Sequence, residues 1–255
     1  MKSLENYSLE NGIYIASSID EKFESLYLKV RNKEKRIYSD AQVSNLPKVL
    51  PSNQHFKEWE LRKITSDRFV SYLQKINGNI NLLDIGCGNG WFSANMAQKK
   101  SINIYALDIN RSELEQAARV FDYSNINFIY GNIFNNIFDE NYFKLITLNS
   151  SLQYFEELET LVNRLFYYLK EDGEIHILDT PFYRSIELAG ARERTNAYYK
   201  SLGFIEMSRH YFHHSYDEIE KFNYYVLFNP NYLMTRIKRL VKIKVSPFPW
   251  IKIVK

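Results

Sequence analysis

The residues best suited to chemistry lie in one glycine-rich stretch of this 255-residue chain, Leu82 to Phe92, which reads LLDIGCGNGWF. A short apolar run, typical of a buried strand, is followed by Gly86, Gly88 and Gly90 and then by a helical pattern. Glycine allows backbone conformations that a Cβ forbids, so a flat ligand can lie directly against the main chain. The stretch therefore predicts a strand, a nucleoside-binding loop and a helix.

The spacing of this loop weighs against a dinucleotide. A dinucleotide loop has the pattern G-x-G-x-x-G/A, whose small third residue lets the helix pack close to a pyrophosphate. In this chain the third position after Gly88 is Trp91. An indole there would collide with a diphosphate placed at the helix N-terminus, which disfavours nicotinamide and flavin cofactors.

A second candidate for ligand binding is Asp108, which ends the next predicted strand, Ile102–Leu107. A carboxylate at this position can accept both hydrogens of a ribose diol. The alternative role, capping the following helix, is better filled by Asn110 or Ser112. Asp108 is therefore predicted to bind ribose.

Together, the loop and the acid resemble the D/E-x-G-x-G-x-G signature of class I S-adenosylmethionine (SAM) dependent methyltransferases, and the resemblance extends over about residues 56–230. It implies SAM as cofactor and S-adenosylhomocysteine (SAH) as product. The residues implied to contact the cofactor are Arg62, Asp84, Gly86, Cys87, Gly88, Gly90, Trp91, Asp108, Ile109, Asn132, Ile133, Asn149 and Ser150.

The resemblance also implies individual roles. Asp84 helps to hold the methionine amino group, and Arg62, or alternatively His55, reaches the SAM carboxylate. Ile109 and Ile133 enclose the adenine ring. The family usually has an aspartate where this chain has Asn132, whose amide can still accept from the adenine amine and donate to the ring.

The elements that must position these residues form an alternating strand and helix pattern. We expect an α/β fold with a doubly wound, mostly parallel, seven-stranded sheet of the Rossmann-like class I methyltransferase type and an N-terminal helical extension. The predicted strands are Leu82–Ile85, Ile102–Leu107, Ile126–Tyr130, Phe143–Leu148, Ile175–Thr180, Ser208–His214 and Asn223–Phe228.

The chain divides into three predicted parts. Residues 1–66 form an accessory or lid segment, residues 67–230 the methyltransferase domain, and residues 231–255 a basic amphipathic tail. The tail contains seven Lys and Arg and no acid, so the rest of the chain carries −4 of the total net charge of +3. Leu233, Ile237, Leu240 and Val241 line one helical face of the tail, which can rest on an anionic membrane or dock on the sheet.

The catalytic group is predicted among His210, His213 and His214, because histidine takes up a proton near neutral pH. Side chains alternate along a strand, so His213 and His214 face opposite sides and only one of them is expected to act as the base. The alternative is that all three decorate an outer strand. No metal-binding spacing accompanies His55, and no metal site is predicted.

The predicted reaction is O-methylation of a small-molecule or a glycan- or lipid-linked acceptor. The tetrapeptide N/D-P-P-Y/F, with which nucleobase amino methyltransferases grip a planar nitrogen, is missing after Phe143–Leu148. Two alternatives remain open: a non-catalytic SAM-binding interaction protein, and an RNA methyltransferase, which would need a basic face near the site. The single cysteine, Cys87, and the lack of an apolar leader predict a cytoplasmic protein.

Overall fold

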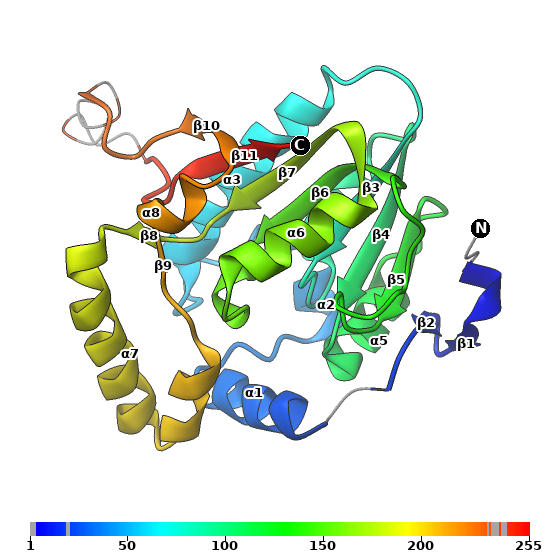
Figure 1. Cartoon of the computed structure of the whole chain (residues 1–255). Coiled ribbons are helices and arrows are strands. Elements are labelled where there is room, and N and C mark those ends of the chain that lie inside the picture. The colour runs from blue at the N-terminus through cyan, green and yellow to red at the C-terminus, as the bar shows by residue number, and fades with distance from the viewer. Residues whose placement is uncertain (1–3, 19–20, 234, 236–239, 241–243) are drawn as a thin grey trace.

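A computed structural model describes residues 4–18, 21–233, 235, 240 and 244–255. Over these residues the chain forms a nine-stranded sheet in the order β1-β2-β5-β4-β3-β6-β7-β11-β10 (Figure 1). The strands of this sheet are β1 (Ser8–Glu10), β2 (Ile13–Ile15), β3 (Ile80–Ile85), β4 (Ile102–Asp108), β5 (Ile126–Tyr130), β6 (Phe143–Asn149), β7 (Leu169–Leu178), β10 (Asn223–Phe228) and β11 (Trp250–Val254).

A separate two-stranded ribbon pairs β8 (Phe182–Tyr183) with β9 (His214–Ser215). The helices are α1 (Glu21–Lys33), α2 (Asp40–Val43), α3 (Phe56–Leu73), α4 (Trp91–Met96), α5 (Arg111–Val120), α6 (Leu158–Tyr168), α7 (Leu188–Leu202) and α8 (Tyr216–Ile219). Short 3-10 helices are η1 (Leu4–Asn6), η2 (Leu152–Tyr154), η3 (Ser185–Glu187) and η4 (Ile205–His210).

The parallel register of the inner strands aligns their carboxyl ends. Ile85 of β3 pairs with both Leu107 of β4 and Leu148 of β6. Asn149, the last residue of β6, pairs with Leu178 at the end of β7. The loops that follow these strands therefore start at one edge of the sheet, where open parallel sheets bind ligands.

Helices cover both faces of the sheet, as the predicted doubly wound fold requires. One core cluster combines the sheet with apolar residues of α3, α4 and α5, such as Phe69, Phe92 and Leu114. The other combines it with α6 and α8, through residues such as Leu161 and Ile219. In Figure 1, α6 lies in front of the sheet and α3 behind it.

A third apolar cluster lies beyond the carboxyl edge of the sheet. It joins α1, α7 and η4 through the buried residues Val30, Tyr199 and Met207. Figure 1 shows α1 and α7 standing off that edge. Helices α1, α7 and η4, which are distant in the sequence, thus form a cap over the loops that follow β3, β4 and β6.

The number of strands corrects the predicted seven. The N-terminal segment contributes β1 and β2, a hairpin whose turn residues Asn11 and Gly12 have φ values of 49° and 81°. Two consecutive positive φ values form the turn that matches the twist of a hairpin. Strand β2 then pairs in parallel with β5, so part of the predicted accessory segment extends the sheet.

The C-terminal strand β11 is the second correction. It lies antiparallel between β7 and β10, and no strand was predicted over its residues. The sheet therefore continues past residue 230, where the predicted domain ended. The predicted amphipathic helix of the tail falls largely on residues 234, 236–239 and 241–243, which lie outside the described residues, and its membrane contact stays a prediction.

The third correction concerns the strand expected over Ser208–His214. This segment contains the end of η4, and only His214 and Ser215 form the short strand β9. Gly203, with φ of 84°, ends α7 and turns the chain, and Met207 then packs against α1 and α7. Burial of Met207 in this cap holds the segment away from the sheet.

Two further searches cover the described residues alone. No helix among them is long and apolar enough to cross a membrane. Nor do they contain a group of three or more His, Cys, Asp or Glu side chains arranged to hold a metal ion.

Strand β11 gives the first prediction. Trp250 is buried, and its Nε1 donates a hydrogen bond of 3.0 Å to Nδ1 of the buried His176. Trp250→Ala should lower the free energy of unfolding by about 3–5 kcal/mol, because it empties a core position and leaves His176 without its donor. Urea denaturation measures the change. Leu240→Ala, at a side chain that is 81% exposed, is the control; an equal effect of both variants would contradict a structural role for β11.

Candidate functional site

Three adjoining cavities open at the carboxyl edge of the sheet. The apolar cavity, of about 230 Å³, lies between the loops after β3, β4 and β5 and helix α1. The polar cavity, of about 110 Å³, lies beside the glycine loop. The tyrosine cavity, of about 420 Å³, lies beneath α1 and α7, and the tyrosines in its wall are Tyr27, Tyr154, Tyr183, Tyr198, Tyr199 and Tyr211.

Asp108 lies in the wall of the apolar cavity at the end of β4. Its carboxylate accepts hydrogen bonds from the backbone N–H groups of Gly88 at 2.7 Å and Asn110 at 2.8 Å. Burial raises the pKa of Asp108, against the effect of these bonds. Ile109 also donates a backbone hydrogen bond to this carboxylate. A carboxylate has about four acceptor positions, so Asp108 is held in place and can still accept from a hydroxyl group.

Two buried amides in the cavity walls have polar atoms without a hydrogen-bond partner. They are Nδ2 of Asn110, in the apolar cavity, and Oδ1 of Asn149, in the polar cavity. Buried polar atoms are nearly always satisfied, so these donor and acceptor groups are available to a ligand. With the Asp108 carboxylate they match a nucleoside that carries a polar, zwitterionic chain, which is the chemistry of SAM.

The glycines of the loop differ in what they do. Gly86 and Gly88 line the cavities and have φ values of 70° and 53°. Gly90, also at positive φ, lies in none of the three walls; a Cβ there would stand 2.8 Å from Cβ of Ala117 and 2.9 Å from the ring of Phe128. In this structure Gly90 is explained by close packing of the loop on α5 and β5.

Asp84 lines the polar cavity but is almost fully enclosed. One carboxylate oxygen accepts from Ser93 Oγ at 2.6 Å and the other from Thr147 Oγ1 at 2.9 Å. Burial raises the pKa of Asp84 to about 6. These bonds tie β3 to α4 and β6, so Asp84 supports the wall of the polar cavity.

Ile109, Ile133 and Asn132 all line the apolar cavity, where the resemblance implies adenine. Oδ1 of Asn132 already accepts from the backbone N–H of Phe134 at 3.0 Å. The backbone N–H of Asn132 donates to Ser17 Oγ at 3.1 Å. The Asn132 side chain thus shapes the loop after β5 as well as facing the cavity, and its contact with adenine stays a prediction.

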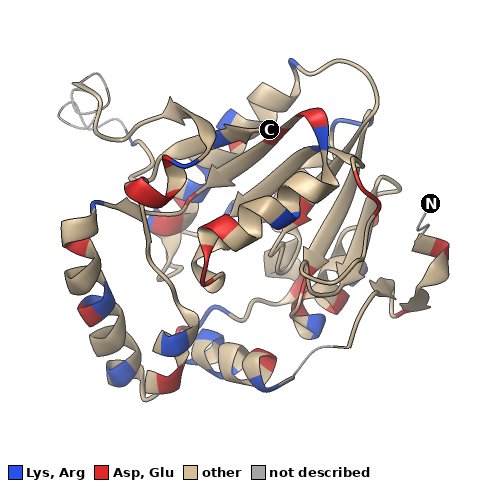
Figure 2. Cartoon of the chain, in the orientation of Figure 1, with Lys and Arg blue, Asp and Glu red and all other residues tan. Residues whose placement is uncertain are grey.

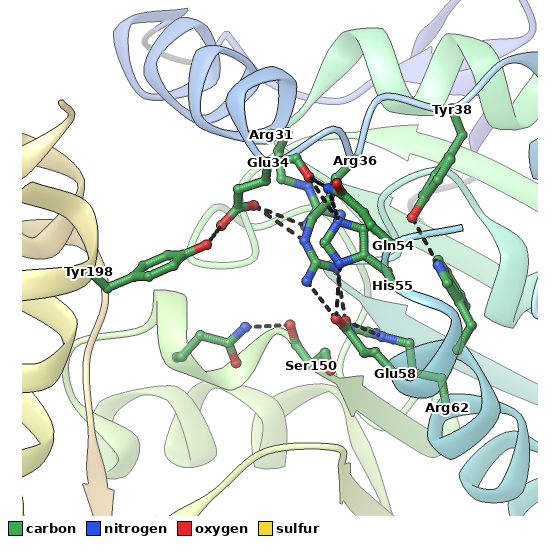
Figure 3. Close-up of polar contacts among 12 residues, drawn as sticks. Arg31, Glu34, Arg36, Tyr38, Gln54, His55, Glu58, Arg62, Ser150 and Tyr198 are labelled. Atoms are coloured by element: carbon green, nitrogen blue, oxygen red, sulfur yellow. Dashed lines mark hydrogen bonds and ion pairs between the residues drawn. The ribbon is translucent and has the colours of Figure 1, made fainter. Parts of the chain in front are cut away.

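The remaining predicted cofactor residues also reach the cavities. The walls of the polar cavity include Cys87, Trp91, Asn149, Ser150 and Arg62. Ser150 has φ of 56°, an uncommon value for a residue with a Cβ, and such strain is often found at functional sites. The Nε of Arg62 donates to Glu58 Oε1 at 3.0 Å (Figure 3).

The three candidate histidines are placed differently. Within the described part of the chain, the walls of the three cavities contain no histidine. His210 is exposed and its ring lies 5.2 Å from that of Phe23. His213 is buried beside Thr195, and His214 is buried with Nε2 3.3 Å from the carbonyl oxygen of Leu152. None of the three histidines lines one of these cavities, and their catalytic role stays a prediction.

Four residues of the site were missed by sequence reasoning: Tyr27 and Arg31 from α1, Glu113 from α5, and Tyr154 from η2. Tyr27 and Tyr154 line all three cavities. Burial raises the pKa of Glu113 to about 7. One signal in the sequence could have found Tyr154, its place in the loop that follows β6. No signal could have found the residues of α1, because the position of this helix depends on the cap.

A family model described as a methyltransferase domain matches residues 76–238, well over half of the chain. The chain belongs to this family of methyltransferase domains. The match begins just before β3 and includes the glycine loop, Asp108 and the loop after β6. The fold, the cofactor and the enzyme class expected from the sequence are thereby confirmed.

Relatives of this methyltransferase match only part of it. A malonyl-[acyl-carrier protein] O-methyltransferase from Priestia megaterium is 26% identical over 130 residues, or 48% of this chain and 47% of that protein. One from Acetivibrio thermocellus is 32% identical over 95 residues, or 37% of this chain and 33% of that protein. This methyltransferase thus spans less than half of the length of these curated relatives.

A solved structure matches over a greater length. Phosphoethanolamine N-methyltransferase 2 from Haemonchus contortus, determined with SAM, superposes with a TM-score of 0.56 at 14% identity. The match covers 94% of this chain and 60% of that chain. At such low identity the likeness shows the shared fold alone.

The second prediction tests the role of Asp108. Asp108→Ala removes a charge-assisted hydrogen bond to the cofactor and should weaken SAM and SAH binding roughly tenfold to a hundredfold, on the order of 1.5–3 kcal/mol. Isothermal titration calorimetry measures both affinities. Asp122→Ala, at an exposed aspartate outside the three walls, is the control. Equal affinities for the two variants would contradict the assignment.

The third prediction concerns pH. An unfolded chain releases the Glu113 proton near pH 4, whereas the folded protein holds it to about pH 7. Stability from this group is therefore complete below pH 4 and is lost as the pH rises to about 7. Relative to the wild type, Glu113→Gln should gain roughly 1–2 kcal/mol in free energy of unfolding between about pH 5 and about pH 8.

Glu115→Gln, on the same helix, is the matched control for this measurement. Hydrogen bonds from Asn11 and Arg111 lower the pKa of Glu115, so this carboxylate is ionised throughout that range. Urea denaturation of the three proteins at both pH values gives the comparison. A Glu113→Gln variant with the same pH dependence as Glu115→Gln would show that Glu113 does not carry the effect.

Proposed function

We propose that this enzyme transfers the methyl group of SAM to an oxygen atom of a small or carrier-linked acceptor that binds in the tyrosine cavity. The observation that supports this proposal is the wall that the polar cavity and the tyrosine cavity share. Tyr27, Arg31 and Tyr154 line both the polar cavity, assigned to the methionine end of SAM, and the larger tyrosine cavity. Two ligands held there would meet across these side chains.

The chemistry asked of the protein is modest. SAM supplies a methyl group already activated on a sulfonium sulfur. The residues of the enzyme need to hold the acceptor in line with that group and to exclude water, and these effects account for large accelerations. The cap of α1, α7 and η4 suits this task, because its apolar cluster closes the cavities on the side away from the sheet.

Transfer to oxygen is supported by the names of the partial relatives, which are O-methyltransferases. Transfer to RNA has less support. Figure 2 shows Lys and Arg interspersed with Asp and Glu along α1 and α7, next to the tyrosine cavity, whereas binding to RNA calls for a basic face. The two cavities together also favour an enzyme over a protein that only binds SAM.

The single cysteine supports a cytoplasmic location.

The fourth prediction separates acceptor binding from cofactor binding. Ala191 is a buried residue of α7 in the wall of the tyrosine cavity. Ala191→Phe should fill part of that cavity and lower methyl transfer at least a hundredfold, while SAM affinity changes less than threefold. Turnover is measured as SAH release with a panel of hydroxyl, carboxyl and amine acceptors, and products are identified by mass.

Ala189→Phe, on an exposed position of the same helix, is the control and should keep wild-type turnover. Wild-type turnover in Ala191→Phe would remove the acceptor from the tyrosine cavity. Products methylated only on nitrogen or carbon would overturn the proposal of O-methylation.

A further inference from the structure

The tyrosine cavity contains an excess of positive charge. Arg31, Arg36, Arg62 and Arg194 lie in its wall, opposed by Glu34 and Glu58. Arg36 holds Glu58 with two hydrogen bonds, of 2.9 Å and 2.5 Å, and Arg62 donates to the same carboxylate (Figure 3). Arg36, Arg62 and Glu58 thus form a compact ion-paired group.

Of the three partly buried arginines in this wall, Arg31 is the least satisfied. Its nearest carboxylate oxygen belongs to Glu34, 3.8 Å from Nη1, and its Nε is buried without a hydrogen-bond partner. Glu34 also accepts from the hydroxyl of Tyr198 and lies 3.4 Å from Nε of Arg36. A buried guanidinium that is only partly paired favours an anionic ligand.

A count of charges extends this point. Arg31, Arg36 and Arg62 also line the polar cavity, so one of them can pair with the carboxylate of SAM. Glu34, Glu58 and that carboxylate would balance three of the four arginines. Glu113 also acts on Arg31 from the wall of the polar cavity, but burial raises its pKa to about 7, so its charge is only partial near neutral pH. Arg194 lies exposed on α7 and lines the tyrosine cavity but neither of the other two cavities. It adds positive charge to this wall, and the carboxylate that acts on it, Glu187, lies outside the wall.

Both carboxylates in the wall of the tyrosine cavity are already engaged. Glu34 accepts from the hydroxyl of Tyr198 and lies 3.4 Å from Nε of Arg36, and Glu58 accepts from Arg36 and Arg62. Burial opposes ionisation of Glu58, but Arg36 and Arg62 hold its pKa down to about 2. Burial raises the pKa of Tyr154, Tyr183 and Tyr198, so these phenols stay neutral near pH 7. An acceptor that is already ionised at neutral pH needs no base, and a carboxylate is such an acceptor.

The tyrosine rings make a continuous wall. The ring of Tyr154 lies 5.8 Å from Tyr27 and 6.2 Å from Tyr211, and Tyr211 lies 6.2 Å from Tyr199. Aromatic walls of this kind pack against flat or apolar groups. A cavity of about 420 Å³ has the size of a typical small-molecule site.

We propose that the acceptor is a carboxylic acid with a flat apolar body, methylated on its carboxylate to give a methyl ester. One carboxylate oxygen forms the new O–CH₃ bond as the S–CH₃ bond breaks, and the electron pair stays on sulfur as SAH leaves. No proton is released. This assignment rests on the proposed function and specifies its substrate class, with Arg31 and Arg194 as the anion-binding residues.

The test measures binding and transfer separately with two matched sets of probes: naphthylacetate, naphthylacetamide and naphthylethanol, and octanoate, octanamide and octanol. Calorimetry on the SAH-loaded enzyme should give at least tenfold tighter binding of naphthylacetate than of its amide and alcohol, and tighter binding of naphthylacetate than of octanoate. Arg194→Gln should reduce the preference for acid over amide to threefold or less.

Arg192→Gln is the matched control, because Arg192 lies on the same helix but outside the wall of the cavity. It should keep the full preference, and SAM affinity should be unchanged in both variants. Equal binding of acid and amide, or a preference that survives Arg194→Gln, would overturn the assignment of a carboxylate.

Incubation with SAM then distinguishes the two proposals. Formation of methyl naphthylacetate supports both. Methylation of an alcohol probe and of neither acid would overturn the carboxylate acceptor but leave O-methylation standing. Tight, Arg194-dependent binding of naphthylacetate with no methyl transfer to any probe would support the anion site and contradict the proposed function.

Discussion

The carboxylate of Asp108 is the interaction on which the cofactor site depends. It accepts one backbone N–H from the glycine loop after β3 and another from the turn after β4, so a single side chain fixes two loops relative to each other. Those loops meet only because β3 and β4 are parallel and end in register. A buried carboxylate with backbone donors in both loops is strongly oriented, and this orientation prepares the cavity before any ligand enters.

The cap over this edge is built from a different kind of interaction. Helices α1 and α7 are far apart in the sequence and share a small apolar cluster with η4. Polar contacts then tie the cap to the core: Glu24 of α1 accepts from both the backbone N–H and the hydroxyl of Ser112 at the start of α5, each at 3.0 Å. The same helix carries Arg31 and Tyr27 into the cavities, so packing of the cap also builds part of the wall of the tyrosine cavity.

Local patterns explain which parts of the fold were predictable. The glycine loop, the strand-terminal acid and the amphipathic helices α5 and α6 each have a signature within a dozen residues, because local packing against one sheet dictates it. Strand β11 has an alternating apolar pattern as well, Trp250-Ile-Lys-Ile-Val, but it follows a basic segment and its partners β7 and β10 are distant in sequence. Asn11-Gly12 is a recognisable hairpin turn, and it could have predicted β1 and β2.

The sequence by itself determined the cofactor class and the strand, loop and helix around the glycine loop, since these have local signatures. Twelve of the thirteen predicted cofactor residues line the cavities, and their contacts with SAM stay predictions. Only the tertiary structure decided the composition of the tyrosine cavity. Its wall combines α1, α3, η2 and α7, and no local pattern specifies how such separate helices meet. The tertiary structure also decided where the candidate histidines lie, because burial of Met207 in the cap, a long-range contact, replaced most of the strand expected over Ser208–His214. His213 packs against Tyr183 and Tyr211 behind the wall of the tyrosine cavity.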